Sequence, residues 1–187
     1  MKRIVIFASG SGSNAENLIK FFHKRENASV ILVLTNNPYA KVLDRCKNLK
    51  VNALSFNKIA FSKSEEVLNT LRAAQPDLIV LAGFLWKFPE FILKVFPNKV
   101  VNIHPALLPN YGGKGMYGIH VHSAVVANKE TETGITIHYV NENYDEGAVI
   151  FQAKCNVLPT DSAEDVAEKI HLLEMKHFPK IINELLK

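Results

Sequence analysis

The chain has 187 residues, of which 48% are hydrophobic and 21% are charged, and it carries a formal net charge of +4 at pH 7. That length supports one hydrophobic core rather than two ordinary domains, so we expect a single domain over residues 1–187. The composition excludes a disordered or fibrous protein, and no apolar run reaches the roughly 20 residues that a membrane helix needs.

The first half of the chain alternates between short apolar runs and amphipathic segments. Ile4–Ala8 is typical of a strand buried on both faces. Helix-opening patterns stand at Ser13–Glu16, Asn37–Pro38 and Ser62–Glu65. Further strands are expected over Val30–Leu34, Leu78–Ala82 and Val100–Ile103, and a short helix over Phe91–Val95. This alternation predicts an α/β fold with a doubly wound, mostly parallel, Rossmann-like sheet.

The second half has a different pattern. Residues 110–120 (NYGGKGMYGIH) are rich in glycine and have no hydrophobic period, which predicts a mobile loop. A short helix is expected over Ser123–Ala127. The runs Gly134–Val140 and Ala148–Cys155 predict an antiparallel addition at the edge of the sheet. Asp161–Glu164 is expected to cap a last amphipathic helix.

A loop of small residues, SGSGSN (9–14), separates the first strand from the first helix. Free N–H groups at a helix N-terminus favour a bound anion, and Gly10 and Gly12 would let the backbone approach a phosphate. No Gly-Lys-Ser/Thr follows, and Ala15 replaces the third glycine of the dinucleotide fingerprint. We therefore expect a cradle for a single phosphate; the alternative is a tight turn without a ligand.

Asn102 and His104 stand at the end of the strand VVNIH, two residues apart and therefore on one side of it. Ligands of open α/β sheets gather at the carboxyl ends of parallel strands. An amide can donate to a developing oxyanion, and an imidazole can donate or shuttle a proton near neutral pH. The pair is a candidate acyl-transfer site, with a structural histidine as the alternative.

His104 also belongs to NIHPALLP (102–109), which lies between LAGF (81–84) and YDEGAVIFQ (144–152). In this order, the motifs closely resemble those of the folate-dependent formyltransferase family, over essentially the whole chain. SGSGSN favours the branch that formylates glycinamide ribonucleotide in de novo purine biosynthesis. The resemblance implies the family's Rossmann-like fold, 10-formyltetrahydrofolate as the formyl donor, and no metal.

The resemblance also implies roles for individual residues. The catalytic residues fall on Asn102, His104 and Asp145. Asn102 and a protonated His104 would stabilise the oxygen of a tetrahedral intermediate, while Asp145 would orient or charge-stabilise the imidazole and help to move protons through water. The substrate-binding residues fall on Gly12, Ser13 and Asn14 for the phosphate and on Glu174 for the ribose. The folate-binding residues fall on Leu85, Trp86, Lys87, Phe88, Asn141, Glu142, Asn143 and Tyr144.

Three features depart from the family pattern or lie outside it. Many relatives carry a basic residue at the position of Trp86, and Lys87 is the candidate to supply that charge. The loop 110–122 is longer than in the shorter members of the family, and is either a lid or a solvent loop. His120 and His122 form an HxH pair without a third ligand at motif spacing, so no metal is expected.

The cysteines and the charge bear on location and partners. Cys46 and Cys155 are isolated, so we expect packing residues in a reducing, cytoplasmic setting. The small positive charge suits an anionic small molecule or RNA. The resemblance implies small-molecule substrates, no nucleic-acid or membrane partner, and a monomer or homodimer.

Three other functions stay open. Methionyl-tRNA formyltransferase would normally lack the SGSGSN loop and carry a further carboxy-terminal domain. Formyltetrahydrofolate hydrolase shares the catalytic trio but usually has a regulatory domain before the first strand. A non-enzymatic phosphosugar-binding module would use the glycine loop and have no need of Asn102, His104 and Asp145 together.

Overall fold

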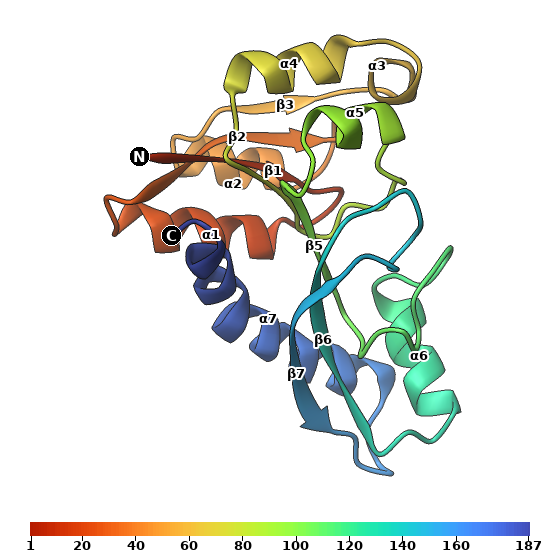
Figure 1. The fold of residues 1–187 in the computed structure, drawn as a ribbon. Coiled ribbons are helices and arrows are strands. Elements are labelled where there is room, and N and C mark those ends of the chain that lie inside the picture. Colours follow the sequence, from red (N-terminus) through yellow and green to blue (C-terminus); the bar gives the residue numbers. More distant parts are fainter.

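A single seven-stranded sheet runs through the computed structural model, which describes residues 1–187 (Figure 1). Its strands are β1 (Lys2–Phe7), β2 (Ala28–Thr35), β3 (Ala53–Ser55), β4 (Leu78–Leu81), β5 (Val100–His104), β6 (Glu132–Tyr139) and β7 (Val149–Asn156). They lie in the order β3-β2-β1-β4-β5-β6-β7. The first five are parallel, and β6 and β7 join antiparallel. This confirms the predicted sheet and its antiparallel addition.

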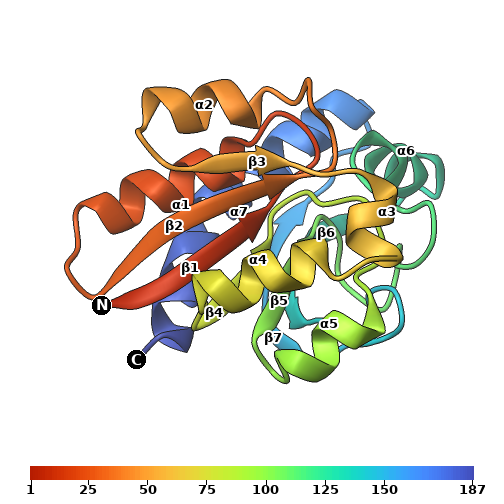
Figure 2. The same ribbon diagram turned by 90° about the horizontal axis from the view of Figure 1, so that it is seen from above.

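Helices cover both faces of the sheet (Figure 2). They are α1 (Ser13–His23), α2 (Val42–Asn48), α3 (Lys58–Ser62), α4 (Glu66–Ala74), α5 (Glu90–Val95), α6 (Ile119–Ala127) and α7 (Ala163–Leu185). Ile4 and Ile6 pack with α1, α2 and α7, whereas Val5 and Phe7 pack with α3, α4 and α5. Alternate residues of β1 thus enter two separate cores, as expected for a strand buried on both faces. None of the helices combines the length and the apolar character needed to cross a bilayer.

Two helices near the amino terminus begin differently from the predicted caps. Gly12, in the left-handed region at φ 73°, precedes α1 without a side-chain cap, so Ser13 lies inside the helix. The Oδ1 atom of Asn37 accepts a hydrogen bond from the N–H of Tyr39 at 2.9 Å. That bond makes a local turn, and α2 begins only at Val42.

Two later capping predictions were also wrong. The helix predicted from Ser62 is α4, but it begins at Glu66 without a side-chain cap, because Ser62 ends the separate short helix α3, which Asn57 caps. Ser162, rather than Asp161, caps α7 through a reciprocal capping box with Asp165. In each case the helix begins within a few residues of the predicted start, because several short polar side chains compete for each helix start.

Thr136 anchors the loop that follows β5. Its fully buried hydroxyl donates to the carbonyl of Ala106 at 2.7 Å and accepts from the N–H of Leu108 at 3.0 Å. The Nε2 atom of Gln152, on β7, donates to Thr136 Oγ1 at 2.9 Å and to the Leu108 carbonyl at 3.0 Å. These bonds, which we call the Thr136 clamp, fix the backbone just beyond His104.

The clamp predicts the effect of removing its hydroxyl. Thr136→Val leaves the buried groups of Ala106 and Leu108 with fewer partners, so the free energy of unfolding should fall by about 1–3 kcal/mol. Chemical denaturation measures this change. Thr133→Val, at a buried threonine of the same strand outside the clamp, is the matched control. An equal or larger loss in Thr133→Val would contradict the clamp.

Candidate active site

A cavity of about 860 Å³ opens at the carboxyl ends of β1, β4 and β5. Its walls come from the glycine loop, the segment after β4, the end of β5, the loop before α6, the β6–β7 connection and α7. This is the position at which open α/β sheets bind ligands. The residues predicted for the phosphate, the ribose and catalysis all line this one cavity: Gly12, Ser13, Asn14, Asn102, His104, Asp145 and Glu174.

The glycine loop is held in shape by α2. A Cβ atom on Gly12 would lie 2.4 Å from Val42 Cγ2, and the backbone there has positive φ, so only glycine fits. The N–H of Val42 donates to the Gly10 carbonyl at 3.2 Å, and Arg45 Nε donates to the Ser11 carbonyl at 2.8 Å. The loop is therefore a fixed turn whose helix N-terminus carries no side-chain cap and faces the cavity.

Asn14 links the start of α1 to α7. Its Nδ2 atom donates to Glu174 Oε2 at 2.8 Å, and its Oδ1 atom is buried without a partner. His171 Nδ1 lies 3.7 Å from the same Glu174 oxygen. The neighbouring Glu174 carboxylate raises the pKa of His171, so the cationic form of the ring is favoured at this end of the cavity. Polar groups suited to a phosphorylated sugar thus gather here.

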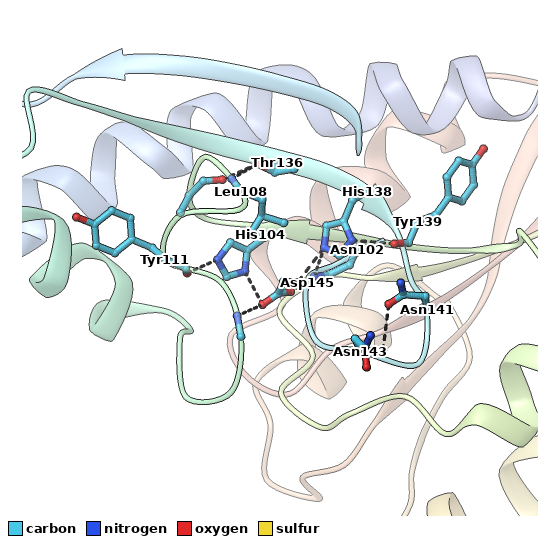
Figure 3. Close-up of polar contacts among 12 residues, drawn as sticks. Asn102, His104, Leu108, Tyr111, Thr136, His138, Tyr139, Asn141, Asn143 and Asp145 are labelled. Atoms are coloured by element: carbon cyan, nitrogen blue, oxygen red, sulfur yellow. Dashed lines mark hydrogen bonds and ion pairs between the residues drawn. The ribbon is translucent and has the colours of Figure 1, made fainter. Parts of the chain in front are cut away.

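Asn102, His104 and Asp145 meet at the other side of the cavity (Figure 3). Asp145 Oδ2 lies 3.5 Å from His104 Nδ1, and Asp145 Oδ1 lies 3.5 Å from Asn102 Nδ2. The N–H of Gly113 donates to Asp145 Oδ2 at 2.9 Å. The sequence spacing predicted that Asn102 and His104 share a face, and the fold adds Asp145 to them from the β6–β7 connection.

Two glycines allow that connection to pack closely against its neighbours. A Cβ atom on Gly147 would lie 1.7 Å from the Tyr139 carbonyl oxygen, so the chain can pass there only without a side chain. A Cβ atom on Gly112 would lie 2.6 Å from Leu108 Cδ2 and 3.3 Å from Asp145 Cβ. The position of Asp145 therefore depends on close backbone packing on both sides of it.

The hydrogen bonds of His104 define its tautomer. Nε2 lies 2.8 Å from the Tyr111 carbonyl oxygen, which can only accept, so Nε2 carries a proton. Nδ1 of the neutral ring is then a free acceptor that faces Asp145. Burial, the largest influence, lowers the pKa of His104, although Asp145 and the Tyr111 carbonyl act in the opposite direction. The resting ring is therefore neutral near pH 7, with an open proton position next to a carboxylate.

Asp145 is charged in this arrangement. Burial by itself would raise the pKa of its carboxyl group. The neighbouring groups, His138 at 3.6 Å, His104 at 3.5 Å and the Gly113 N–H, together outweigh burial and hold that pKa below its ordinary value. A carboxylate that stays ionised while largely buried can stabilise a positive charge on the neighbouring imidazole.

The residues predicted for folate lie in four places. Leu85 and Tyr144 line the main cavity. A neighbouring groove of about 530 Å³ is lined by Lys87, Phe88 and Glu142. Trp86 packs against Phe56, Phe61 and Phe84, with Lys58 Nζ 4.5 Å from its ring centroid. Asn141 Oδ1 accepts the N–H of Asn143 inside the β6–β7 connection.

Three histidines that sequence reasoning did not place belong to the site. His171 and His122 line the cavity, and His122 Nδ1 is buried without a partner. His138 lies beside Asn102 and Asp145. His120, the other half of the HxH pair, is exposed, and no three His, Cys, Asp or Glu side chains are arranged to hold a metal ion. One signal in the sequence could have predicted that His138 is buried beside the site: side chains alternate between the two faces of a strand, and His138 falls on the same face of β6 as Thr136.

Comparisons with known proteins agree with this geometry. The family model described as Formyl transferase matches residues 2–182. The phosphoribosylglycinamide formyltransferase of Bacillus subtilis (strain 168) is 34% identical over 194 residues, which cover 100% of this chain and 95% of that protein. The chloroplastic enzyme of the same name from Arabidopsis thaliana is 33% identical over 98% of this chain, and the chain spans 65% of that relative's length. The crystal structure of glycinamide ribonucleotide transformylase 1 from Geobacillus kaustophilus matches with a TM-score of 0.89, at 34% identity and full coverage of both chains.

The environment of His104 predicts its titration. NMR should give His104 a pKa below 6.5, and Asp145→Asn should lower that pKa further because it removes the carboxylate that favours the imidazolium. Asp44→Asn, at an exposed position on α2, should leave it unchanged. A His104 pKa above 6.5, or one that rises in Asp145→Asn, would contradict the arrangement.

Proposed function

The chain belongs to the formyl transferase family, and we propose that it is an enzyme that transfers the formyl group of 10-formyltetrahydrofolate to the amine of glycinamide ribonucleotide, in de novo purine biosynthesis. One observation carries the proposal. The anion cradle at residues 10–14 and the cluster of Asn102, His104 and Asp145 line the same cavity. A phosphorylated substrate that is anchored at one end can therefore present its other end to the cluster.

The ribonucleotide binds at the glycine-loop end. Its phosphate lies on the N–H groups of Gly12, Ser13 and Asn14, where the dipole of α1 favours negative charge. Glu174 accepts from the ribose hydroxyls, and His171 adds positive charge nearby. The Oδ1 atom of Asn14 is a buried acceptor without a protein partner, which suits a hydroxyl donor of the ribose rather than the phosphate.

The folate binds at the end formed by Leu85–Phe88 and Asn141–Tyr144. Leu85 and Tyr144 offer apolar contact inside the cavity, and the aromatic packing of Trp86 fixes the segment that carries Leu85. Lys87 lines the adjacent groove with Lys58 and Lys94, which suits an anionic part of the folate outside the main cavity. Backbone groups of the segment, rather than the side chain of Trp86, meet the pterin.

The reaction forms one bond to the formyl carbon and breaks another. The substrate amine attacks that carbon, the carbonyl electron pair moves to the oxygen, and collapse of the intermediate breaks the bond to folate N10. The amine loses a proton and N10 gains one. Asn102 donates to the oxyanion, while His104 and Asp145 handle the proton at the Nδ1 position between them.

His104 begins neutral and becomes charged during the transfer. Its Nδ1 lone pair accepts a proton, and the resulting imidazolium stabilises the negative oxygen. Asp145, held ionised 3.5 Å away, stabilises the imidazolium. This sequence reconciles the protonated histidine expected from the family with the buried, neutral ring of the resting site.

We also propose that residues 1–187 act as one domain, on small molecules alone, in the cytoplasm. Two free cysteines suit a reducing compartment, and the net charge of +4 is accounted for by anionic substrates. A monomer or homodimer is sufficient, since one chain supplies every group that the proposed chemistry uses.

An assay of folate deformylation with and without glycinamide ribonucleotide tests the function. The purified protein should deformylate the folate only when the amine is present. His104→Ala and Asp145→Asn should each lower kcat by roughly 100-fold or more, the cost typical of losing a group that stabilises a transition state. His23→Ala and Asp44→Asn, at exposed positions on α1 and α2, should retain wild-type turnover.

Other results of this assay would indicate a different function. Deformylation without the amine would identify a hydrolase, and none at all would identify a binding module. Near-wild-type turnover in His104→Ala or Asp145→Asn would reject the assigned catalytic residues.

A further inference from the structure

His138 lies directly opposite Asn102. The antiparallel pairing of β5 and β6 places Asn102 beside His138 and His104 beside Thr136. The His138 side chain is 2% exposed, and it does not line the cavity. Figure 3 shows its ring next to Asn102 and Asp145. The mechanism described above does not use it, so this buried polar group needs a separate explanation.

The two ring nitrogens of His138 have different partners. Nδ1 lies 2.8 Å from the carbonyl oxygen of Tyr139, which can only accept, so Nδ1 carries the proton. Nε2 of the neutral ring is then an acceptor, 3.1 Å from Nδ2 of Asn102. A backbone carbonyl thus selects the tautomer, and the tautomer presents a lone pair to the Asn102 amide.

That lone pair determines which way the amide faces. With Nδ2 toward His138, one amide N–H donates to Nε2 at 3.1 Å and the other faces Asp145 Oδ1 at 3.5 Å. The reverse orientation would put the amide oxygen against a lone pair and a carboxylate, which is repulsive. The contact with Asp145 is the longer of the two, so its N–H is the one that a substrate oxygen can take over.

We propose that His138 is a positioning residue for formyl transfer: its neutral, Nδ1-protonated ring holds the Asn102 amide so that one N–H stays directed at the reacting oxygen. The proposal rests on the proposed function. Asn102 touches the reacting atoms, and His138 acts only through it. A purely structural His138 would instead matter through the bond from Nδ1 to Tyr139 at the end of β6.

Two substitutions separate these roles. The end of a glutamine side chain reaches the place of Nε2, so His138→Gln keeps an acceptor for Asn102. The end of an asparagine side chain reaches the place of Nδ1, so His138→Asn keeps the donor to Tyr139. His138→Asn should lower kcat by about 10- to 100-fold, a loss below that of deleting the oxyanion donor itself. His138→Gln should stay within about fivefold of wild type, with both KM values nearly unchanged, because the substrate anchors are intact.

The proposal is overturned if His138→Asn retains more activity than His138→Gln, or if the loss lies in KM. In the Asn102→Ala background, His138→Asn should cause no further loss, since the amide that it positions is gone. A further loss there also overturns the proposal.

A measurement on the wild-type protein is independent of turnover. Nitrogen–proton correlation spectra of labelled histidine should show His138 as the neutral Nδ1–H tautomer. An Nε2–H tautomer would reject the proposal even if every variant failed to fold. Absence of amine-dependent transfer in the wild-type protein would reject the proposed function instead, so the two failures are distinguishable.

Discussion

The buried carboxylate of Asp145 is the point on which the site depends. Its side chain is 11% exposed, and it draws together the end of β5, the loop before α6 and the end of β6. An ionised carboxylate removed from water is costly unless neighbouring groups compensate it. The Gly113 N–H and the Asn102 amide provide that compensation. The same contacts that stabilise the charge also place the proposed catalytic groups.

The change from parallel to antiparallel pairing at β6 makes this convergence possible. A parallel neighbour would have run in the same direction as β5 and left the edge of the sheet by a long crossover. The antiparallel strand instead presents His138 and Thr136 to the two functional residues of β5, one for each. The β6–β7 connection then returns over the cavity. The sheet therefore supplies the supporting contacts, while the loops supply the groups that would touch the substrates.

Hydrophobic patterning was sufficient to predict every strand except β3, because buried parallel strands have few other solutions, whereas β3 is a short, mostly exposed edge strand without an apolar run. Helix starts were harder. The turn at Gly12 depends on its contact with Val42, and that contact joins segments about 30 residues apart, which local pattern does not encode. His138 was missed for the same reason, since its role follows from cross-strand register. The ring of Phe88, assigned to folate by motif, is 3% exposed and packs in a core although the residue lines the neighbouring groove, so its assignment rests on its backbone.

The central claim is that two different ligands occupy opposite ends of one cavity and meet at Asn102 and His104. Amide chemical-shift mapping tests it most directly. Glycinamide ribonucleotide should perturb residues 10–14 and Glu174, and tetrahydrofolate without a formyl group should perturb residues 83–88 and 141–145. The two ligands should bind at the same time, and the complex with both should change the chemical shift of the Asn102 side-chain amide. Competition between the two ligands, or shifts confined to other surfaces, would contradict the account.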